Sequence, residues 1–182
     1  EYYNLSEHDK TTKYAGFGFD ASVHEMYPPL AAGAQIHIIP EEMRMDIQGI
    51  CRYIDSKGIN IGFFPTPVCE LLSKEKCHTL EKVITGGDKL KSFSEDYVIY
   101  NNYGPTECTV LTTAYCVDRV YDNIPIGKPI TNTEVYIVNK TGQLQPIGLI
   151  GEIWISGAGL ARGYINDESR TRENFIPNPF RR

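Results

Sequence analysis

The sequence predicts an α/β fold: a mostly parallel sheet flanked by helices, followed by a small β-rich unit. Two observations support this prediction. Through the first two-thirds of the chain, short apolar runs that suit strands alternate with segments of helical periodicity, a pattern typical of parallel sheets whose strands are joined by helices. The last third carries strand-like runs and few helical ones. We therefore expect an α/β subdomain over residues 1–120 and a β-rich unit over residues 121–182.

The first predicted elements surround an aromatic run punctuated by glycine. Residues 14–19 are expected to end a buried strand, and Asp20 can then cap a helix over residues 23–30. The Pro28–Pro29 pair is expected to disturb the end of that helix. Alternating apolar residues then predict a short strand over residues 35–39.

An amphipathic helix is the next predicted element. Ile47, Ile50, Cys51 and Ile54 lie at positions i, i+3, i+4 and i+7, so their side chains share one face of a helix. Gly58 follows closely and is placed to end the helix, because glycine readily takes the left-handed conformation found just after helix ends. We expect the apolar face of this helix to cover the sheet.

Three more strands are predicted, over residues 59–64, 83–85 and 97–100. A helix after the first of them should begin at Thr66-Pro67, which suits a cap and a first turn. This succession favours a flavodoxin-like subdomain, in which ligands sit beyond the carboxyl ends of the strands. Three unusual loops each follow a predicted strand, and we expect them to share one cleft.

The last third should form the β-rich unit. Strands are predicted over residues 133–138 and 152–156, and residues 140–142 have the composition of a turn. A short helix is expected over residues 168–174.

The composition excludes several classes of function. Of the 182 residues, 41% are hydrophobic and 23% charged, and the formal net charge is −5. We find no basic run, so neither nucleic acid nor an anionic membrane surface is an expected partner. No apolar stretch reaches the roughly 20 residues of a membrane helix, and there is no signal peptide, so we expect a cytoplasmic protein. The five cysteines have no metal-site or disulfide-framework spacing and are expected to be free thiols.

The most informative loop is Asn102-Tyr103-Gly104-Pro105-Thr106-Glu107. It offers an aromatic ring, a glycine that permits close backbone approach, a hydroxyl and a carboxylate. Such a set can stack on a nucleobase, bond a phosphate oxygen and hold Mg²⁺. The same residues equally suit a plain turn at Gly104-Pro105 with solvated polar neighbours.

Four segments resemble motifs of one superfamily. Residues 101–107 match the pattern Asn-x-Tyr-Gly-Pro-Thr-Glu of adenylate-forming enzymes, and residues 19–23 resemble their earlier Phe-Asp-x-Ser motif. Residues 151–164 resemble a later motif, whose ending Gly-Leu-Ala-Arg-Gly-Tyr is more typical of peptide synthetases than of acyl-CoA ligases. Residues 125–130 are also similar to the family. The chain therefore resembles the central part of an adenylation domain from a nonribosomal peptide synthetase.

The resemblance implies an activity. Such enzymes convert an amino acid and Mg·ATP to an aminoacyl adenylate and pyrophosphate, and then transfer the acyl group to the phosphopantetheine thiol of a carrier domain. The implied partners are the carrier and condensation domains of the same synthetase. The family's glycine-rich phosphate loop should precede this sequence, and the small domain with the catalytic lysine should follow it. We therefore expect the isolated chain to be truncated at its C-terminus and inactive in adenylation.

Roles for individual residues also follow from the resemblance. Asp20 would pair with the α-ammonium group of the substrate, although taken alone it also suits a plain helix cap. Thr106 and Glu107 would be the catalytic residues: Thr106 would bond a phosphate oxygen and Glu107 would bind Mg²⁺. Tyr103 would stack on adenine. The residues implied to contact the nucleotide are Gly86, Gly87, Asn102, Tyr103, Gly104 and Thr106. The two glycines also suit a tight turn between strand and helix.

The amino-acid pocket is implied by residues that match the family's specificity-determining positions. These are Asp20, Ala21, His24, Phe63, Ile84, Gly86, Asn102, Val110 and Leu111. Most are apolar, so we expect a neutral, medium-sized substrate such as leucine. His24 is unusual at its position and could narrow the pocket, bond a polar side chain or be a core histidine. Each apolar member could also belong to the ordinary core.

Two alternatives differ from this interpretation. One is another adenylate-forming ligase, acting on D-alanine or on an acyl or aryl acid; Asp20 argues against acids that lack an amine. The other is a ligand-binding subdomain or scaffold without catalysis. The retained polar residues Asp20, Thr106 and Glu107 argue against a decayed scaffold.

Overall fold

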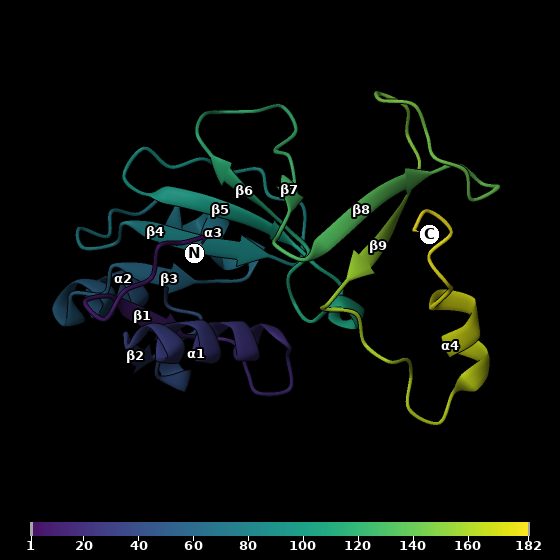
Figure 1. Ribbon diagram of the computed structural model, residues 1–182. Coiled ribbons are helices and arrows are strands. Elements are labelled where there is room, and N and C mark those ends of the chain that lie inside the picture. Colours follow the sequence, from purple (N-terminus) through teal and green to yellow (C-terminus); the bar gives the residue numbers. More distant parts are fainter. Residues whose placement is uncertain (1, 182) are drawn as a thin grey trace.

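The computed structural model describes residues 2–181. The strands of its large sheet are β1 (Lys10–Lys13), β2 (Gln35–Ile38), β3 (Ile61–Phe63), β4 (Lys82–Gly86), β5 (Val98–Tyr103), β6 (Thr113–Val117) and β7 (Lys128–Pro129). The strands of a second, two-stranded sheet are β8 (Thr133–Val138) and β9 (Glu152–Gly157). Figure 1 shows the small sheet extending away from the edge of the large one, with the C-terminal helix beyond it. The predicted α/β sheet followed by a β-rich unit is confirmed.

The order of strands in the large sheet is β2-β1-β3-β4-β5-β6-β7. The first five strands are parallel to their neighbours, while β6 and β7 are added antiparallel. The order 2-1-3-4-5 is the flavodoxin-like arrangement, in which connections leave in opposite directions on the two sides of β1 and β3. A crevice is therefore expected at the carboxyl ends of these two strands.

The strand predicted over residues 97–100 is longer than expected. It continues through Tyr103, because Asn101, Asn102 and Tyr103 pair in register with β6. These residues were expected in a loop, and no strand was predicted over the residues of β6. The first half of the predicted nucleotide loop is thus held rigidly by the sheet.

The helices are α1 (Ala21–Ala32), α2 (Ile47–Lys57), α3 (Thr66–Leu72) and α4 (Glu168–Asn174), with short 3₁₀ turns η1 (Glu41–Met43) and η2 (Thr106–Cys108). Helix α2 has the expected form. Asp46 accepts a 2.9 Å hydrogen bond from the Gly49 N–H at its start, and Gly58 ends it with φ 65°. Thr66 lies inside α3, where its hydroxyl donates to the Asp88 carbonyl.

Two expectations about the first elements were wrong. Helix α1 runs to Ala32 with Pro28 and Pro29 inside it, and Gly33 ends it in the left-handed conformation with φ 77°. The first strand ends at Lys13, and residues 14–19 form a loop. The reason for the early end lies in Glu25, whose carboxylate accepts the Tyr14 and Ala15 N–H groups.

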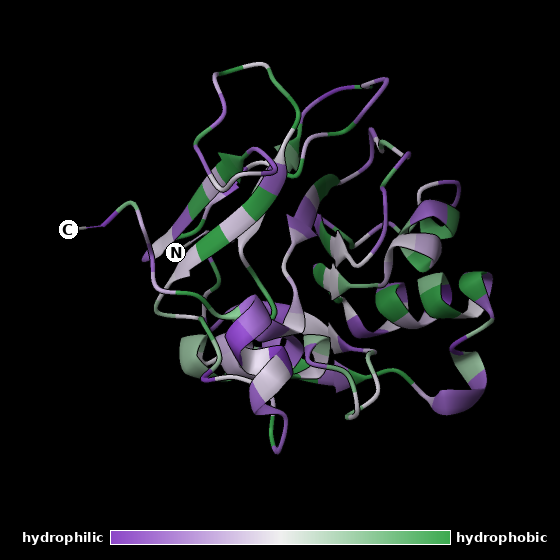
Figure 2. Ribbon diagram, turned by 90° about the vertical axis from the view of Figure 1, so that its right-hand side faces the viewer, coloured by the Kyte–Doolittle hydropathy of each residue, from purple (hydrophilic) through white to green (hydrophobic). Residues whose placement is uncertain are grey.

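The main core lies between the large sheet and helices α2 and α3. Ile50, Ile54 and Phe64 are fully buried there. A second, smaller apolar cluster is built on Tyr3, Ile61 and Ile84, and Leu5 and Phe63 pack against it. By contrast, α4 has the polar sequence ESRTREN and no buried residue, and it stands out in hydrophilic colours in Figure 2.

The cysteine prediction needs a correction. Cys51 of α2 and Cys77, in the segment after α3, form a disulfide with 5.1 Å between their Cα atoms. Both lie in the main core, where packing brings the helix and the segment together. The spacing of the two cysteines along the sequence gives no indication that they lie close together. Cys69, Cys108 and Cys116 are free.

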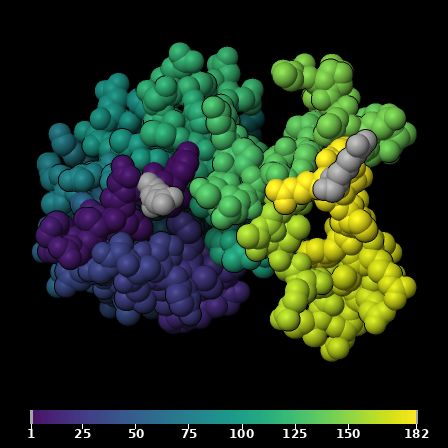
Figure 3. Space-filling model, viewed as in Figure 1, coloured from purple at the N-terminus to yellow at the C-terminus, as the bar shows by residue number. Residues whose placement is uncertain are grey.

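The β-rich unit predicted for the last third contains one antiparallel pair of strands. Strands β8 and β9 pair from Thr133–Gly157 to Val138–Glu152, and Gly142 closes the expected turn with φ 76°. Figure 3 shows this unit standing beside the main body, with an indentation between them on the face in view. The division between residues 120 and 121 stays a prediction, and β7 beyond it completes the large sheet. Within the described residues, no helix has the length and apolar character needed to cross a membrane.

Candidate functional site

A cavity of about 390 Å³ lies at the carboxyl ends of the parallel strands. The loop after β1 forms one wall, the ends of β3 and β4 contribute Phe63 and Gly86, and β5 with its following loop closes the other side. Eight of the nine residues predicted for the amino-acid pocket line it: Asp20, Ala21, His24, Phe63, Gly86, Asn102, Val110 and Leu111. Of the predicted nucleotide contacts, Gly87 and Gly104 also face this space.

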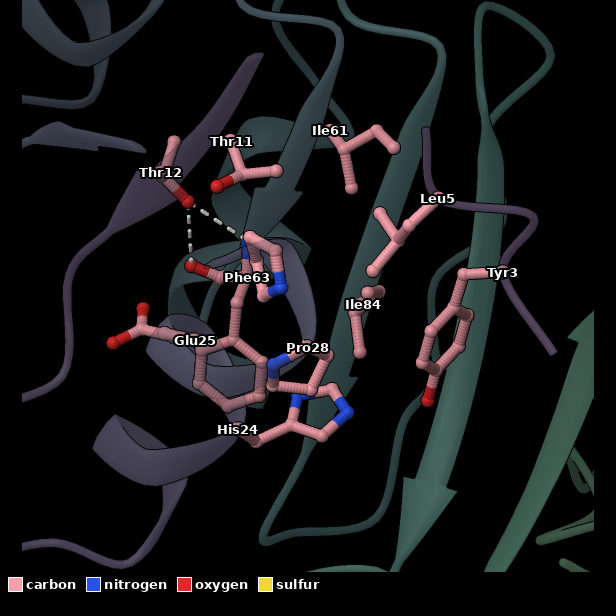
Figure 4. A pocket seen from close by; sticks show the side chains of 11 residues that line it. Tyr3, Leu5, Thr11, Thr12, His24, Glu25, Pro28, Ile61, Phe63 and Ile84 are labelled. Atoms are coloured by element: carbon pink, nitrogen blue, oxygen red, sulfur yellow. Dashed lines mark hydrogen bonds between the residues drawn. The ribbon is translucent and has the colours of Figure 1, made fainter. Parts of the chain in front are cut away.

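Ile84 is the ninth predicted pocket residue, and the structure places it elsewhere. It lines a second cavity of about 20 Å³, together with Tyr3, Leu5 and Thr11. His24 and Phe63 line both cavities, so they separate the two spaces. Figure 4 shows the rings of His24 and Phe63 near each other, and Ile84 on strand β4.

His24 lies in an apolar environment. Its ring meets Tyr3 edge-on at 5.6 Å between centroids and tilts against Phe63 at 6.1 Å. Burial lowers the pKa of His24 from 6.5 to about 4, so the ring is neutral at neutral pH. Tyr3 was missed in the sequence analysis, since it precedes every recognisable motif. Its hydroxyl accepts a 2.6 Å hydrogen bond from the Asn102 side chain and so fixes another pocket residue.

Asp20 occupies the N-cap position of α1, but its side chain does not cap the helix. Within residues 2–181 its side chain makes no capping hydrogen bond. Its Oδ2 instead accepts a 2.5 Å hydrogen bond from the Thr106 hydroxyl, which lies 86 residues away in the sequence. The structure therefore brings together the motif at residues 19–23 and the motif at residues 101–107.

The loop after β5 depends on glycine for its close contacts. A Cβ on Gly104 would lie 2.2 Å from the Val110 carbonyl oxygen, and one on Gly86 would lie 2.6 Å from the Asn102 carbonyl oxygen. At the contact with Gly104 the chain turns through Thr109 and Val110, whose φ angles are 55° and 72°. Such angles are strained for a β-branched residue. Val110 is thus held in an uncommon conformation where it lines the cavity.

Glu107 is held by the C-terminal unit. Its Oε1 accepts a 2.5 Å hydrogen bond from the Tyr164 hydroxyl, and this bond holds the pKa of the Glu107 carboxyl below its usual value. Nearby, the Ala161 N–H donates to the Glu107 carbonyl at 2.7 Å, and the Thr109 hydroxyl donates to the Gly159 carbonyl at 2.6 Å. The motif at residues 151–164 therefore packs directly on the motif at residues 101–107.

Tyr103, Thr106 and Glu107 do not line the main cavity. They lie on the strand end and 3₁₀ turn beside it, and Thr106 reaches its rim through the bond to Asp20. The structure thus collects eight of the nine predicted amino-acid contacts in one cavity and places the predicted catalytic residues next to it.

A buried ion pair supports the loop that carries Asp20. Lys13 Nζ lies 3.0 Å from Glu25 Oε2, and the two side chains are 7% and 0% exposed. The two Glu25 oxygens accept the Tyr14 and Ala15 N–H groups at 2.7 and 2.9 Å, while Lys13 donates to the Ala15 carbonyl. Lys13 and Glu25 were not predicted as a pair, because only the folded loop brings them together. The one feature of the sequence that could have indicated the pair is Glu25, a charged residue in a mostly apolar helix.

The donors of this site suit one Mg²⁺ ion and a nucleotide. Among the residues that the structure describes, no group of three His, Cys, Asp or Glu side chains could enclose a metal. Glu107 is a single ionised carboxylate, which fits Mg²⁺, since proteins commonly bind that ion through one or two carboxylates and the phosphates of a substrate. At Gly87, with φ 96°, the position of a Cβ faces open space, so a flat ring can approach the backbone there.

Comparisons with known proteins agree with the fold and the motifs. The family described as AMP-binding enzyme matches residues 1–165. Bacitracin synthase 1 of Bacillus licheniformis is 49% identical over 179 residues, which is 98% of this chain and 3% of that protein. Surfactin synthase subunit 2 of Bacillus subtilis (strain 168) is 42% identical, again over 98% of this chain and over 5% of that protein. The chain therefore spans a small part of the length of these relatives.

Solved structures give the same result. The nonribosomal peptide synthetase FmoA3 (S1046A) superposes with a TM-score of 0.90 at 26% identity, over 98% of this chain and 21% of that one. The N-terminal subdomain of Klebsiella oxytoca NpsA, in complex with 3-hydroxybenzoyl-AMSN, superposes with a TM-score of 0.84 at 27% identity, over 96% and 46% of the two chains.

Proposed function

Because the chain belongs to the AMP-binding enzyme family, we propose that it carries the amino-acid pocket of an ATP-dependent ligase of nonribosomal peptide synthesis. The observation that carries this proposal is the position of Asp20, a carboxylate at the rim of a mostly apolar cavity and beside Thr106. Such a carboxylate can hold an ammonium group while the apolar wall receives a neutral side chain. An enzyme for acids without an amine has no need of it.

The proposed reaction joins an amino acid to the α-phosphate of ATP. An oxygen of the substrate carboxylate attacks the α-phosphorus, and the bond from that phosphorus to the β-phosphate oxygen breaks, releasing pyrophosphate. The chain's residues contribute by positioning and by stabilising charge. Asp20 holds the ammonium group, Thr106 donates to a phosphate oxygen, and Tyr103 stacks on adenine. Glu107 holds Mg²⁺, which when bound neutralises phosphate charge.

The substrate we propose is a neutral amino acid of medium size such as leucine. Ala21, Phe63, Val110 and Leu111 give the cavity an apolar lining, and His24 adds no charge at neutral pH. In the complete synthetase, the acyl group would pass to a phosphopantetheine thiol on a carrier domain that works beside a condensation domain. A screen in which a charged amino acid binds best would contradict the substrate proposal.

The test is amino-acid-dependent exchange between ATP and pyrophosphate by a chimera. Residues 14–117 replace the matching segment of a complete adenylation domain, and circular dichroism checks that the chimera folds. We expect exchange with one neutral amino acid, abolished by Asp20→Ala and retained by Asp96→Ala, which changes an exposed carboxylate of the same segment away from the cavity. Exchange only with an acid that lacks an amine would place the chain among acyl or aryl ligases. A folded chimera that is silent toward every acid would favour a non-catalytic subdomain.

A further inference from the structure

One hydrogen bond joins the amino-acid side of the site to the nucleotide side. Thr106 Oγ1 donates to Asp20 Oδ2 over 2.5 Å, between the turn after β5 and the start of α1. This distance is typical of a hydroxyl bonded to an ionised carboxylate, which is stronger than a bond between neutral groups. In the described part of the chain it is the one hydrogen bond that the Asp20 side chain makes.

We propose that this bond couples the two ligands of the site: a phosphate bound at Thr106 strengthens the binding of an ammonium group at Asp20, and the ammonium group strengthens the binding of the phosphate. The inference rests on the function proposed above, which assigns an ammonium group to Asp20 and a phosphate oxygen to Thr106. Thr106 then acts on the amino acid through Asp20, as a positioning residue, besides touching the nucleotide.

The direction of the coupling follows from the number of protons. A threonine hydroxyl has one proton to donate, and a phosphate oxygen only accepts. Thr106 must therefore release Asp20 when it donates to a phosphate. The half-buried Asp20 carboxylate then has no protein donor at the edge of an apolar cavity, and an ammonium group, which has three donors, replaces the one it lost.

Binding of an ammonium group at Asp20 likewise strengthens the binding of a phosphate at Thr106. An ammonium group at Asp20 supplies the donors that the carboxylate needs, so the Thr106 hydroxyl is free to turn toward a phosphate. Thermodynamic linkage requires the two effects to be equal, since each ligand changes the affinity of the other by one common factor. For the loss and recovery of one charge-assisted bond, we expect a factor of about ten, which corresponds to about 1.4 kcal/mol.

The experiment measures the dissociation constant of L-leucine by calorimetry, with and without saturating AMP and Mg²⁺. It is done on the full 182-residue chain and on the chimera. We expect leucine to bind about tenfold more tightly with AMP present. In Thr106→Ala this factor should fall toward one, while Thr106→Ser keeps it. Thr109→Ala is the matched control, because its hydroxyl lies in the same turn but donates to the Gly159 carbonyl.

A ligand control separates the bond from general effects of AMP. The acid 4-methylpentanoate has the side chain of leucine without the amine, so its affinity should not rise with AMP. Two ligands that bind without coupling, or coupling that persists in Thr106→Ala, would overturn the inference and leave the proposed function intact. If neither ligand binds to either protein, the proposed function fails as well.

A second measurement needs no ligand. In a double-mutant cycle of Asp20→Asn and Thr106→Ala, the shifts in the denaturation midpoint should be non-additive if the bond exists in the free protein. Additive shifts would show that the two side chains do not interact and would overturn the inference.

Discussion

The Tyr164 hydroxyl donates a 2.5 Å hydrogen bond to Oε1 of Glu107, joining residues 57 apart in the sequence. Tyr164 belongs to the segment that follows the two-stranded sheet, while Glu107 belongs to the turn after β5. Arg170 lies over the Tyr164 ring at 4.3 Å from its centroid and adds positive charge near Glu107. The C-terminal unit thus sets the charge and orientation of the carboxylate that we propose as the Mg²⁺ ligand.

Replacement of Tyr164 by phenylalanine should raise the pKa of Glu107. The Tyr164 bond is the largest of the effects that lower this pKa, so the carboxyl should titrate closer to its usual value without it. The measurement is a ¹³C NMR titration of the Glu107 side-chain carboxyl. Tyr136→Phe is the matched control, because Tyr136 donates a 2.6 Å bond to Glu134 and not to Glu107. Equal Glu107 pKa values in the two variants would contradict the assignment.

Gly104→Ala should disrupt the loop that carries Thr106 and Glu107. The added methyl group would lie 2.2 Å from the Val110 carbonyl oxygen and 2.8 Å from the Leu111 Cα, both of which are backbone atoms. Backbone shifts forced by such overpacking cost about 1–3 kcal/mol. Urea denaturation measures the loss. Gly18→Ala is the control, since a Cβ there meets no atom within 4 Å, and a similar loss in both variants would refute the steric argument.

Lys13→Met should destabilise the fold and loosen the loop that carries Asp20. It leaves the buried Glu25 carboxylate without its cation, a change that typically costs about 3–5 kcal/mol. The free energy of unfolding and the amide exchange rates of Tyr14 and Ala15 report the two effects. In Arg172→Met, which breaks the exposed pair with Glu168, the stability loss should be much smaller. Equal losses of stability in the two variants would show that the buried Lys13–Glu25 pair contributes no more than an exposed pair.

Much of the fold could be predicted because its signals are local. The apolar spacing of α2 and the glycine after it act within a few residues, and both appear as expected. The strand extension through Tyr103 could not be predicted in this way. It depends on pairing with β6, whereas its own residues Asn101 and Asn102 have low intrinsic strand preference.

The candidate site shows the same division. Motif residues supplied the members of the cavity, but not the contacts among them. The Asp20–Thr106 and Tyr164–Glu107 bonds each join segments that only the tertiary fold brings together. Ile84 shows the limit of matching positions: two bulky rings, His24 and Phe63, separate it from the main cavity, and no motif encodes the orientation of those rings.

His24 should make the stability of the chain sensitive to acid. Its pKa is about 4 in the folded protein, because burial disfavours the charged ring, whereas the unfolded chain should have the ordinary value of 6.5. Between these values the unfolded state binds the proton that the folded state rejects. Stability should therefore fall as the pH drops from 6.5 to about 4, by at most about 1.4 kcal/mol per pH unit from this group.

The measurement is the free energy of unfolding of the wild type and of His24→Gln at pH values from 7 to 4. Glutamine fills similar space and does not titrate in this range, so the difference between the two proteins isolates the contribution of His24. As the pH falls from 6.5 to about 4, the free energy of unfolding of His24→Gln should rise relative to that of the wild type. The reason is that the variant has no buried imidazole from which a proton must be excluded. His8→Gln, which alters an exposed histidine, should keep the wild-type profile. Parallel profiles for the wild type and His24→Gln would mean that the ring accepts its proton in the folded state, so that it reaches water or an acidic partner inside the cavity.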